Sequence, residues 1–580
     1  AQEDEAEGAS PRDLRIAWQD RLDLAFYLDD ETADRGTDRL RALRSAHFHG
    51  NVETHHPRFD LTSDTQRITL DHPDQGANDR DALRRIDATG NVNLHARPEN
   101  EDPLRMQTDN LAIHLDPGPA GDIQPHRVVA TGGVRTEQPG QRLSARELEL
   151  IFATTDSAAT QPGTPLFEQR AGIERMIATG DVRVELDEPD TELTGARLVA
   201  DTIADQIELT APADELAYVV REDRVLAGRH LLMRESDRSV HVDGEGWFDA
   251  QLAADDPADQ LRVSWQRAMH YDDHAGFARF VGRVRATTRK THTTARLSSD
   301  DLQLQLAVGE ADGTEDENGN EEDEDENENR DDGDGLTTDR PIRTATARGN
   351  VRFIAEQHEP DTGKLRTRLR IDGPLMSFDG EQEQIQVLGA GAMLIEDRRP
   401  PEDEDPDRDS DRIQFGGRGE TLFTWERQLT LDAARNDVRM QGTVQMVHRP
   451  AVNDDDAQQI IQLDTEQLFA DLSGSGGLGG WAGDEATSTA DTATPELRLV
   501  RADDNVRVLY DAGRSIVRSD HLQYTADDQI VRLWADEDRL VRIRRDDQPA
   551  PLSFEEGFWN LATDEFDARR LGPGVVPVPE

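Results

Sequence analysis

Residues 178–186 read "ATGDVRVEL", and residues 88–96 read "ATGNVNLHA". Both stretches place a small residue, Gly and a polar residue ahead of Val and a short alternating run. The phrase returns as "FHGNVETHH" (48–56), "ATGGVRTEQ" (130–138), "FVGRVRATT" (280–288), "ARGNVRFIA" (347–355), "MQGTVQMVH" (440–448) and, more degraded, "ADDNVRVLY" (502–510). In chain order, the four copies from 48–56 to 178–186 follow one another at intervals of about 40 to 50 residues, which is typical of stacked repeat architectures.

Alternation after each Gly divides the side chains between the two faces of a strand. The apolar face comprises Val92, Leu94, Val182, Val184, Leu186, Val351, Phe353, Val506 and Val508. The preceding Gly and Asn or Asp tolerate positive φ, so we expect them to turn the chain. Helical periodicity is nearly absent. The sequence therefore predicts an all-β chain of many short antiparallel strands, each with one apolar face.

A partner segment follows each phrase. Its copies include "FDLTSDTQRITLD" (59–71), "LRMQTDNLAIHLD" (104–116), "QRLSARELELIF" (141–152), "ELTGARLVADTIADQIELTAP" (192–212), "ARLSSDDLQLQLAV" (295–308) and "SIVRSDHLQYTADDQIVRLWA" (515–535). Each combines an alternating start, polar residues typical of a turn, and a second alternating run. The pattern predicts a hairpin in every partner segment.

Trp residues mark a longer period. "AWQDRLDLAFYLDD" (17–30), "SWQRAMHYDDHAGF" (264–277) and "TWERQLTLDAARND" (424–437) each lead from Trp through an alternating run to a Gly phrase. We predict a first module at 1–250, a second at 251–308 and 340–397, and a third at 412–472 and 496–570. Acidic inserts at 309–339 and 398–411, and a flexible Gly/Ser/Thr linker at 473–495, interrupt them.

The charge of the chain restricts its partners. The 580 residues carry 120 acids against 65 Lys and Arg, a formal net charge of −55. Binding to nucleic acid or to an anionic membrane surface is disfavoured, because both are strongly negative. Adaptation to a salty environment is an equally good explanation of the acidity. No run of 18 apolar residues occurs, and the absence of Cys excludes disulfides and thiol catalysis.

Catalytic and metal-binding signals are weak. No P-loop, GxSxG, Rossmann glycine pattern or HExxH motif is present, and acid pairs are too common to nominate a catalytic dyad. His47 and His49 alternate and would share one strand face, where they either ligate a metal or form a polar surface pair. We take the second interpretation. The sequence thus predicts a protein that is not an enzyme, with no cofactor, catalytic residue or metal ligand.

The repeated phrase, written A-x-G-[ND]-V-x-[VLF], resembles the OstA-like family, as does "LTGARLVADTIADQIEL" (193–209). This family comprises periplasmic lipopolysaccharide-transport proteins and the N-terminal domain of the organic solvent tolerance protein. The resemblance covers roughly residues 17–310 and 340–570. The chain is several times longer than a single-module member, which implies several modules fused in one polypeptide.

The resemblance implies stacked antiparallel strands that form an elongated V-shaped trough or a jelly-roll solenoid. Lipid acyl chains would lie between its sheets, against the nine apolar residues listed above. Lipopolysaccharide or a similar glycolipid would be carried in the periplasm toward the outer membrane, and other bridge proteins would join by edge-strand addition. Association with the outer membrane is left open. The alternative is a structural or adhesive cell-surface β-solenoid, whose apolar faces form a dry core and whose acidic loops bind cations.

Overall fold

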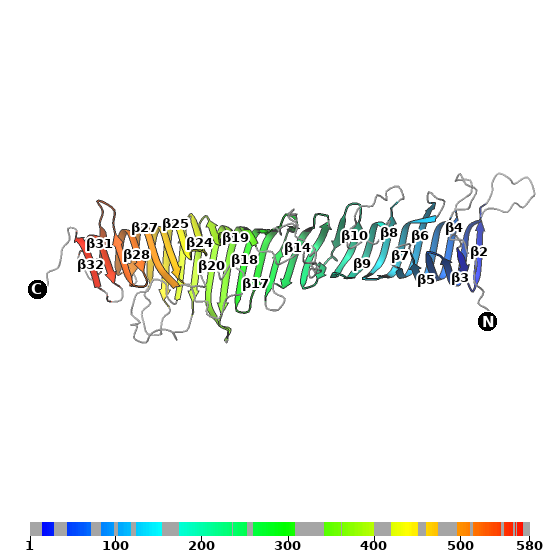
Figure 1. The fold of residues 1–580 in the computed structure, drawn as a ribbon, viewed down its shortest axis with the longest axis horizontal. Coiled ribbons are helices and arrows are strands. Elements are labelled where there is room, and N and C mark those ends of the chain that lie inside the picture. Colours follow the sequence, from blue (N-terminus) through cyan, green and yellow to red (C-terminus); the bar gives the residue numbers. More distant parts are fainter. Residues whose placement is uncertain are drawn as a thin grey trace, which may run out of the picture. The chain divides into compact units, whose positions relative to one another are not determined.

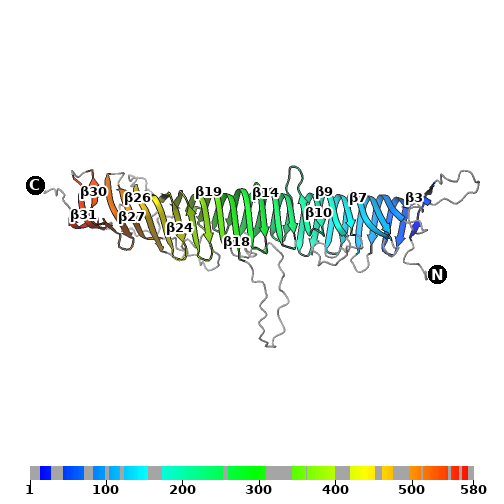
Figure 2. The ribbon, with the colours of Figure 1, turned by 90° about the horizontal axis from the view of Figure 1, so that it is seen from above.

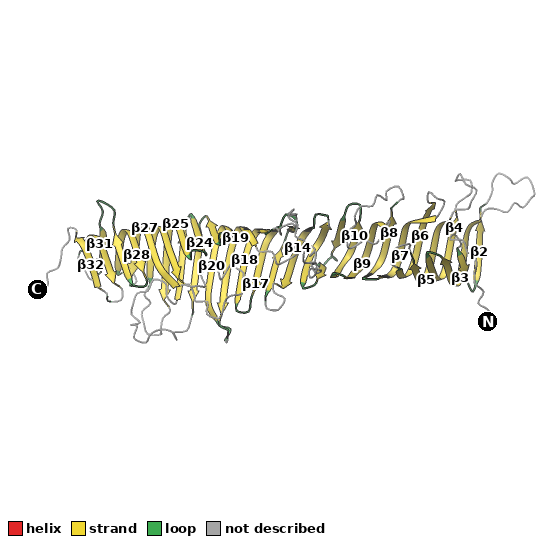
Figure 3. Cartoon of the chain, viewed as in Figure 1, coloured by secondary structure: helices red, strands yellow, loops and turns green. Residues whose placement is uncertain are grey.

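The structure is a computed structural model. It describes residues 14–27, 43–70, 83–97, 103–117, 123–153, 173–234, 236–251, 259–307, 342–360, 362–398, 419–450, 460–473, 496–510, 514–546, 550–560, 563 and 565–571. Every regular element in these ranges is a β-strand (Figure 3). No helix in the described part of the chain is long and apolar enough to cross a membrane.

The chain divides into two compact units, Ala1–Phe248 and Asp249–Glu580. The first contains β1 (Arg15–Ala17), β2 (Arg21–Phe26), β3 (Leu43–His56), β4 (Phe59–Leu70), β5 (Leu83–Ala96), β6 (Leu104–Pro117), β7 (Ile123–Gln138), β8 (Gln141–Phe152), β9 (Ile173–Asp187), β10 (Asp190–Asp201), β11 (Gln206–Thr210), β12 (Ala217–Arg221) and β13 (Arg224–Arg234), and the division falls within β14 (Ser239–Gln251).

The second unit contains β15 (Gln260–Trp265), β16 (Ala268–Asp272), β17 (Phe277–Arg289), β18 (Thr293–Leu306), β19 (Ile342–His358), β20 (Leu365–Asp379), β21 (Gln384–Leu388), β22 (Gly391–Asp397), β23 (Gly419–Trp425), β24 (Gln428–Asp432), β25 (Asp437–Pro450), β26 (Ile461–Ser473), β27 (Glu496–Tyr510), β28 (Ser515–Thr525), β29 (Ile530–Trp534), β30 (Val541–Arg545), β31 (Leu552–Asn560) and β32 (Glu565–Leu571).

Within each unit, long strands that follow one another in the chain lie side by side and antiparallel (Figures 1 and 2). From β3 to β10, and from β17 to β20, every strand pairs with the next one in sequence. The predicted all-β class and the stacking of antiparallel strands are confirmed. Alternating burial along the strands accounts for it: in β5, Ile86, Ala88 and Val92 are buried, whereas Arg85, Asn91 and Asn93 are exposed.

Each Gly phrase lies inside a long strand. In β5 the Gly90–Asn91 pair stands opposite the single residue Asp109 of β6, because Thr89 pairs with Asn110 and Val92 with Thr108. Two residues against one define a β-bulge, which bends the strand and increases its twist. The phrase is therefore a bend within a continuous strand and does not join two short strands.

All eight phrases place two consecutive residues at positive φ. The pairs are Gly50 and Asn51, Gly90 and Asn91, Gly132 and Gly133, Gly180 and Asp181, Gly282 and Arg283, Gly349 and Asn350, Gly442 and Thr443, and Asp504 and Asn505. The first residue of the pair is Gly in seven copies. Positive φ is one reason for Gly, and the close approach of a neighbouring side chain is a second. A Cβ at Gly180 would lie 2.8 Å from Cδ of Arg146, a side chain of the preceding strand β8. Equivalent side chains cover the other six glycines, so neighbouring bends stack closely.

The prediction of a hairpin in every partner segment is wrong for four of the six segments. Residues 59–71, 104–116, 141–152 and 295–308 form, within their described parts, the single strands β4, β6, β8 and β18. Their polar central residues lie opposite the bends of the neighbouring phrases, and the chain does not reverse there. The segments 192–212 and 515–535 do form hairpins, β10 with β11 and β28 with β29.

The three Trp segments share one construction. Trp18, Trp265 and Trp425 stand where two short strands meet, and each pair of short strands lines up along one long strand: β1 and β2 along β3, β15 and β16 along β17, β23 and β24 along β25. The three-module division stays a prediction. The acidic insert at 309–339, most of the insert at 398–411 and most of the linker at 473–495 lie outside the described residues.

Candidate functional site: the apolar interior

The Val of the phrase is buried in all eight copies. Val52, Val92, Val134, Val182, Val284, Val351, Val444 and Val506 are each at most 2% exposed. Each stands immediately after the bend of its strand, so the bend directs its side chain inward at the same point of every repeat. This row of valines marks the centre of the apolar interior within each unit.

The nine predicted site residues lie on four strands. Val92 and Leu94 are on β5, Val182, Val184 and Leu186 on β9, Val351 and Phe353 on β19, and Val506 and Val508 on β27. Leu94 and Phe353 are half-buried, and the other seven are buried. The structure therefore distributes them along the interior of both units and does not bring them into one pocket.

Each bend divides its strand into two parts, which we call limbs. The limb before the bend supplies further inward residues that the sequence reasoning missed. They include Ala46, Phe48, Ile86, Ala88, Val128, Ala130, Met176, Ala178, Ala278, Phe280, Val438, Met440, Val500 and Ala502, all buried. Most of them stand two and four residues before the Gly. The alternating pattern on the N-terminal side of the Gly would have identified them, because the buried residues stand at even distances from the Gly on both sides of the bend.

The two limbs pack on each other. In the first repeat, Ala46 and Phe48 before the bend form one cluster with Val52 after it and with Ile68 of β4. Side chains from both limbs thus occupy the space between them, as in an ordinary close-packed protein core.

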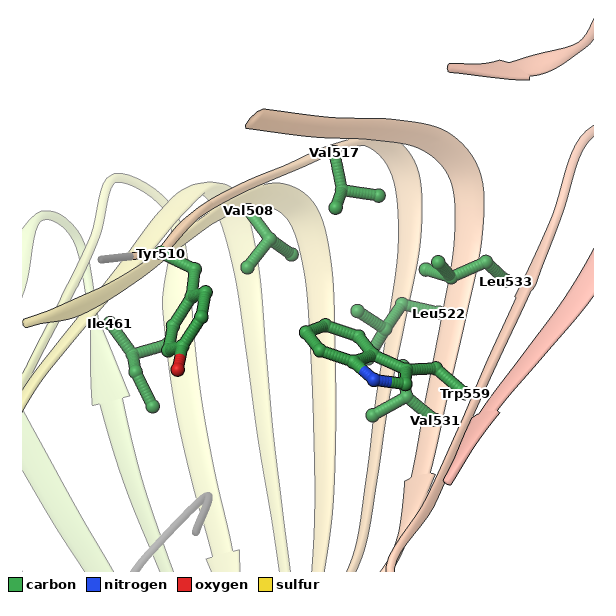
Figure 4. A pocket seen from close by; sticks show the side chains of 8 residues that line it. All are labelled: Ile461, Val508, Tyr510, Val517, Leu522, Val531, Leu533 and Trp559. Carbon is green, nitrogen blue, oxygen red and sulfur yellow. The ribbon is translucent and has the colours of Figure 1, made fainter. Parts of the chain in front are cut away.

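One apolar cavity lies between the limbs in the second unit (Figure 4). Its lining residues are Ile461 of β26, Val508 and Tyr510 of β27, Val517 and Leu522 of β28, Val531 and Leu533 of β29, and Trp559 of β31. The cavity measures about 20 Å³, room for about one water molecule, whereas a core cavity that binds benzene is about 150 Å³. Of the nine predicted residues, only Val508 lines it.

One polar side chain of the interior, His448, is hydrogen-bonded and uncharged at neutral pH. His448 of β25 is 1% exposed and faces inward with Val444 and Met446. Its Nδ1 lies 2.8 Å from Oγ1 of Thr421, in a hydrogen bond. Burial lowers the pKa of His448 to about 4. The imidazole is therefore neutral at pH 7, and the interior stays compatible with apolar contents.

The outward faces carry the charges. Arg183 of β9 is exposed beside the inward Val182 and Val184, and it pairs with Glu185 and Glu192 at 3.0 Å. In the second unit Arg368 of β20 bonds Glu356 at 2.8 Å and Glu396 at 3.1 Å on the two flanking strands. Alternation thus separates an ion-paired outer surface from an apolar interior.

No family model matches the chain, and no curated protein matches it. Sixteen chains of solved structures are similar to it. One is LptH of Pseudomonas aeruginosa, described as the LptA homologous periplasmic component of the conserved lipopolysaccharide transport device. The match has 16% sequence identity and a TM-score of 0.17, and covers 27% of this chain and 93% of LptH.

Proposed function

We propose that this chain is a non-enzymatic periplasmic bridge protein that binds lipopolysaccharide or a similar glycolipid in its apolar interior and carries it toward the outer membrane. The observation that carries the proposal is the repeated two-limbed strand, whose inward faces are mainly apolar on both sides of the bends. Acyl chains would lie between the limbs against the nine residues from Val92 to Val508, and the sugars would remain in solvent.

Lipid entry requires the limbs to separate, because side chains fill the interior. An acyl chain that replaces these contacts keeps the inward residues out of water. Its own apolar surface also leaves water, which contributes a favourable free energy of about 25 cal/mol per Å² buried. Packing is incomplete at the cavity between Val508 and Trp559, where Tyr510 and Trp559 are only half-buried. We infer that separation of the limbs begins there.

Partner proteins would add to unpaired strand edges. Among the described residues, β2 pairs only with β3 and β32 only with β31. Leu24 and Phe26 of β2 are 50% and 47% exposed, and Leu571 of β32 is 61% exposed. An unpaired edge with exposed apolar side chains is suited to strand addition, which supports an end-to-end assembly with other bridge proteins.

A structural or adhesive cell-surface solenoid is the second candidate, and the close packing of the limbs favours it. In that case the interior is permanently dry and the function lies in the outer surface. The acidic loops proposed to bind cations fall outside the described residues, so this candidate rests on the interior alone.

Native mass spectrometry of the chain, purified from a host that makes lipopolysaccharide, separates the two candidates. A bridge protein is expected to carry glycolipid in a defined ratio and to bind purified lipopolysaccharide again after delipidation. A chain that stays lipid-free in both experiments would support the solenoid and contradict lipid binding.

A further inference from the structure

Three potential metal ligands meet on the outer face at the start of the first unit. His47 and His49 are alternate residues of β3 and share one face. Asp23 of β2 is the direct cross-strand partner of His47. Since opposite residues of an antiparallel pair have Cβ atoms about 5 Å apart, this register brings the carboxylate beside both imidazoles.

The side chains are already close. One ligand atom from each of the three residues can be chosen so that all lie within 4.8 Å of one another. Nε2 of His49 is 3.2 Å from Oδ2 of Asp23, and the two imidazole centroids are 4.0 Å apart. Ligands of a tetrahedral Zn²⁺ at 2.0–2.1 Å from the metal are about 3.4 Å apart, so small side-chain rotations complete the geometry.

We propose that Asp23, His47 and His49 form a binding site for a divalent transition-metal ion of the Zn²⁺ type. Two imidazole nitrogens and one carboxylate oxygen are ligands that such ions prefer, and water would fill the remaining positions. The side chain of Asp23 is half exposed and that of His49 is 23% exposed, so an ion can reach the site from solvent. The metal would link the edge strand β2 to β3.

A neighbouring cation competes with a metal ion for the carboxylate of Asp23. The competing group is Arg21, which lies opposite His49, bonds Asp23 at 2.8 Å and approaches Nε2 of His49 to 3.5 Å. Arg21 is 68% exposed and can swing into solvent when a metal takes the carboxylate.

Cobalt titration of the chelator-treated full chain tests the site. Co²⁺ reports ligand type through its visible absorption, and 0.5 M NaCl suppresses loose binding to the many exposed carboxylates. We expect one Co²⁺ with nitrogen ligation, displaced by Zn²⁺. His47→Ala, His49→Ala and Asp23→Asn should each weaken binding at least about ten-fold, since even outer-shell changes cost that much. Arg21→Ala should tighten it.

Two controls keep the result specific. His55 lies on the same strand and pairs with Asp60 at 2.9 Å, outside the cluster, so His55→Ala should leave the cobalt spectrum unchanged. Arg279 pairs with Asp301 at 2.7 Å in the second unit, and Arg279→Ala should not tighten binding. Circular dichroism confirms folding of each variant. Unchanged affinity in the His47 and His49 variants, or equal loss in His55→Ala, would overturn the proposal.

Discussion

Gly132 and Gly133 of β7 show that positive φ and close approach of a neighbouring side chain are two distinct reasons for Gly at the bends. Both have positive φ, at 94° and 78°. A Cβ at Gly132 would lie 2.5 Å from Cβ of Asp109, whereas a Cβ at Gly133 would meet nothing within 4 Å. At Gly132 both the backbone conformation and the lack of space disfavour a side chain, whereas at Gly133 only the backbone conformation does.

We therefore expect Gly133→Ala to lower the free energy of unfolding by about 1 kcal/mol, the usual penalty of a left-handed Ala. Gly132→Ala should cost about 3 kcal/mol, because the side chain of Asp109 must also move. Urea denaturation of both variants measures the difference. Equal losses would show that the stacking of Asp109 on the bend contributes nothing.

His448 predicts a pH dependence of stability in the second unit. Its folded pKa is about 4 because of burial, while an unfolded His has a pKa of about 6.5. Between these values the unfolded state binds more protons. The contribution of the neutral, buried His448 is complete above pH 6.5 and is lost as the pH falls toward 4, to a total of about 3 kcal/mol.

His448→Gln keeps a hydrogen-bonding side chain near Thr421 but does not titrate. The difference in unfolding free energy between wild type and this variant should shrink as the pH falls from 7 to 4.5. Measuring the difference cancels the titration of the carboxylates that both proteins share. A difference that is constant over this range would contradict the buried neutral imidazole.

At the scale of the element, the edge strand β2 is the part most exposed to partners. Leu24 and Phe26 are about half exposed, and strand edges that carry Lys resist pairing. We expect the full chain to self-associate through its edges in 0.5 M NaCl, where its charge is screened, and the double variant Leu24→Lys, Phe26→Lys to associate less. Sedimentation velocity measures this.

Ile203 supplies the matched control, because it is 68% exposed in the turn between β10 and β11, away from either edge. Ile203→Lys should associate as the wild type does. If all three proteins associate equally, or if the wild type stays monomeric at high concentration, the β2 edge is not a docking strand.

Alternation in the sequence predicted the inward residues of the strands, because a half-buried strand must alternate; Val92, Val182 and Val184 are all buried. It did not predict that β5 continues through Gly90 and Asn91. Positive φ is required both by hairpin turns and by bulges, and the local sequence does not distinguish them.

The candidate metal site shows the other limit. Alternation alone predicts that His47 and His49 share one face of a strand. Asp23 joins them only through the register between β2 and β3. Alternation within one strand does not reveal which residue of another strand stands opposite. Whether a residue pair becomes a three-ligand site is therefore decided by long-range pairing.

At the scale of the whole molecule, the net charge of −55 should limit stability at low salt. Self-repulsion is spread over the chain, and raising NaCl from 0.05 to 1 M shortens the screening length from about 14 to 3 Å. We expect the thermal midpoint to rise by several degrees, as measured by calorimetry. A fall would mean that ion pairs such as Arg183 with Glu192 stabilise the strands more than the acid excess destabilises them.

The central claim is that the interior receives acyl chains, and site-specific photo-crosslinking tests it most directly. A small diazirine-bearing side chain at the buried Val184, similar in size to the native residues, avoids overpacking. The same group at the exposed neighbour Arg183 reports the outer face. In cells that make lipopolysaccharide, we expect crosslinks to the glycolipid from position 184 and none from position 183. Crosslinks from 184 only to other residues of this chain would show a closed core and contradict lipid transport.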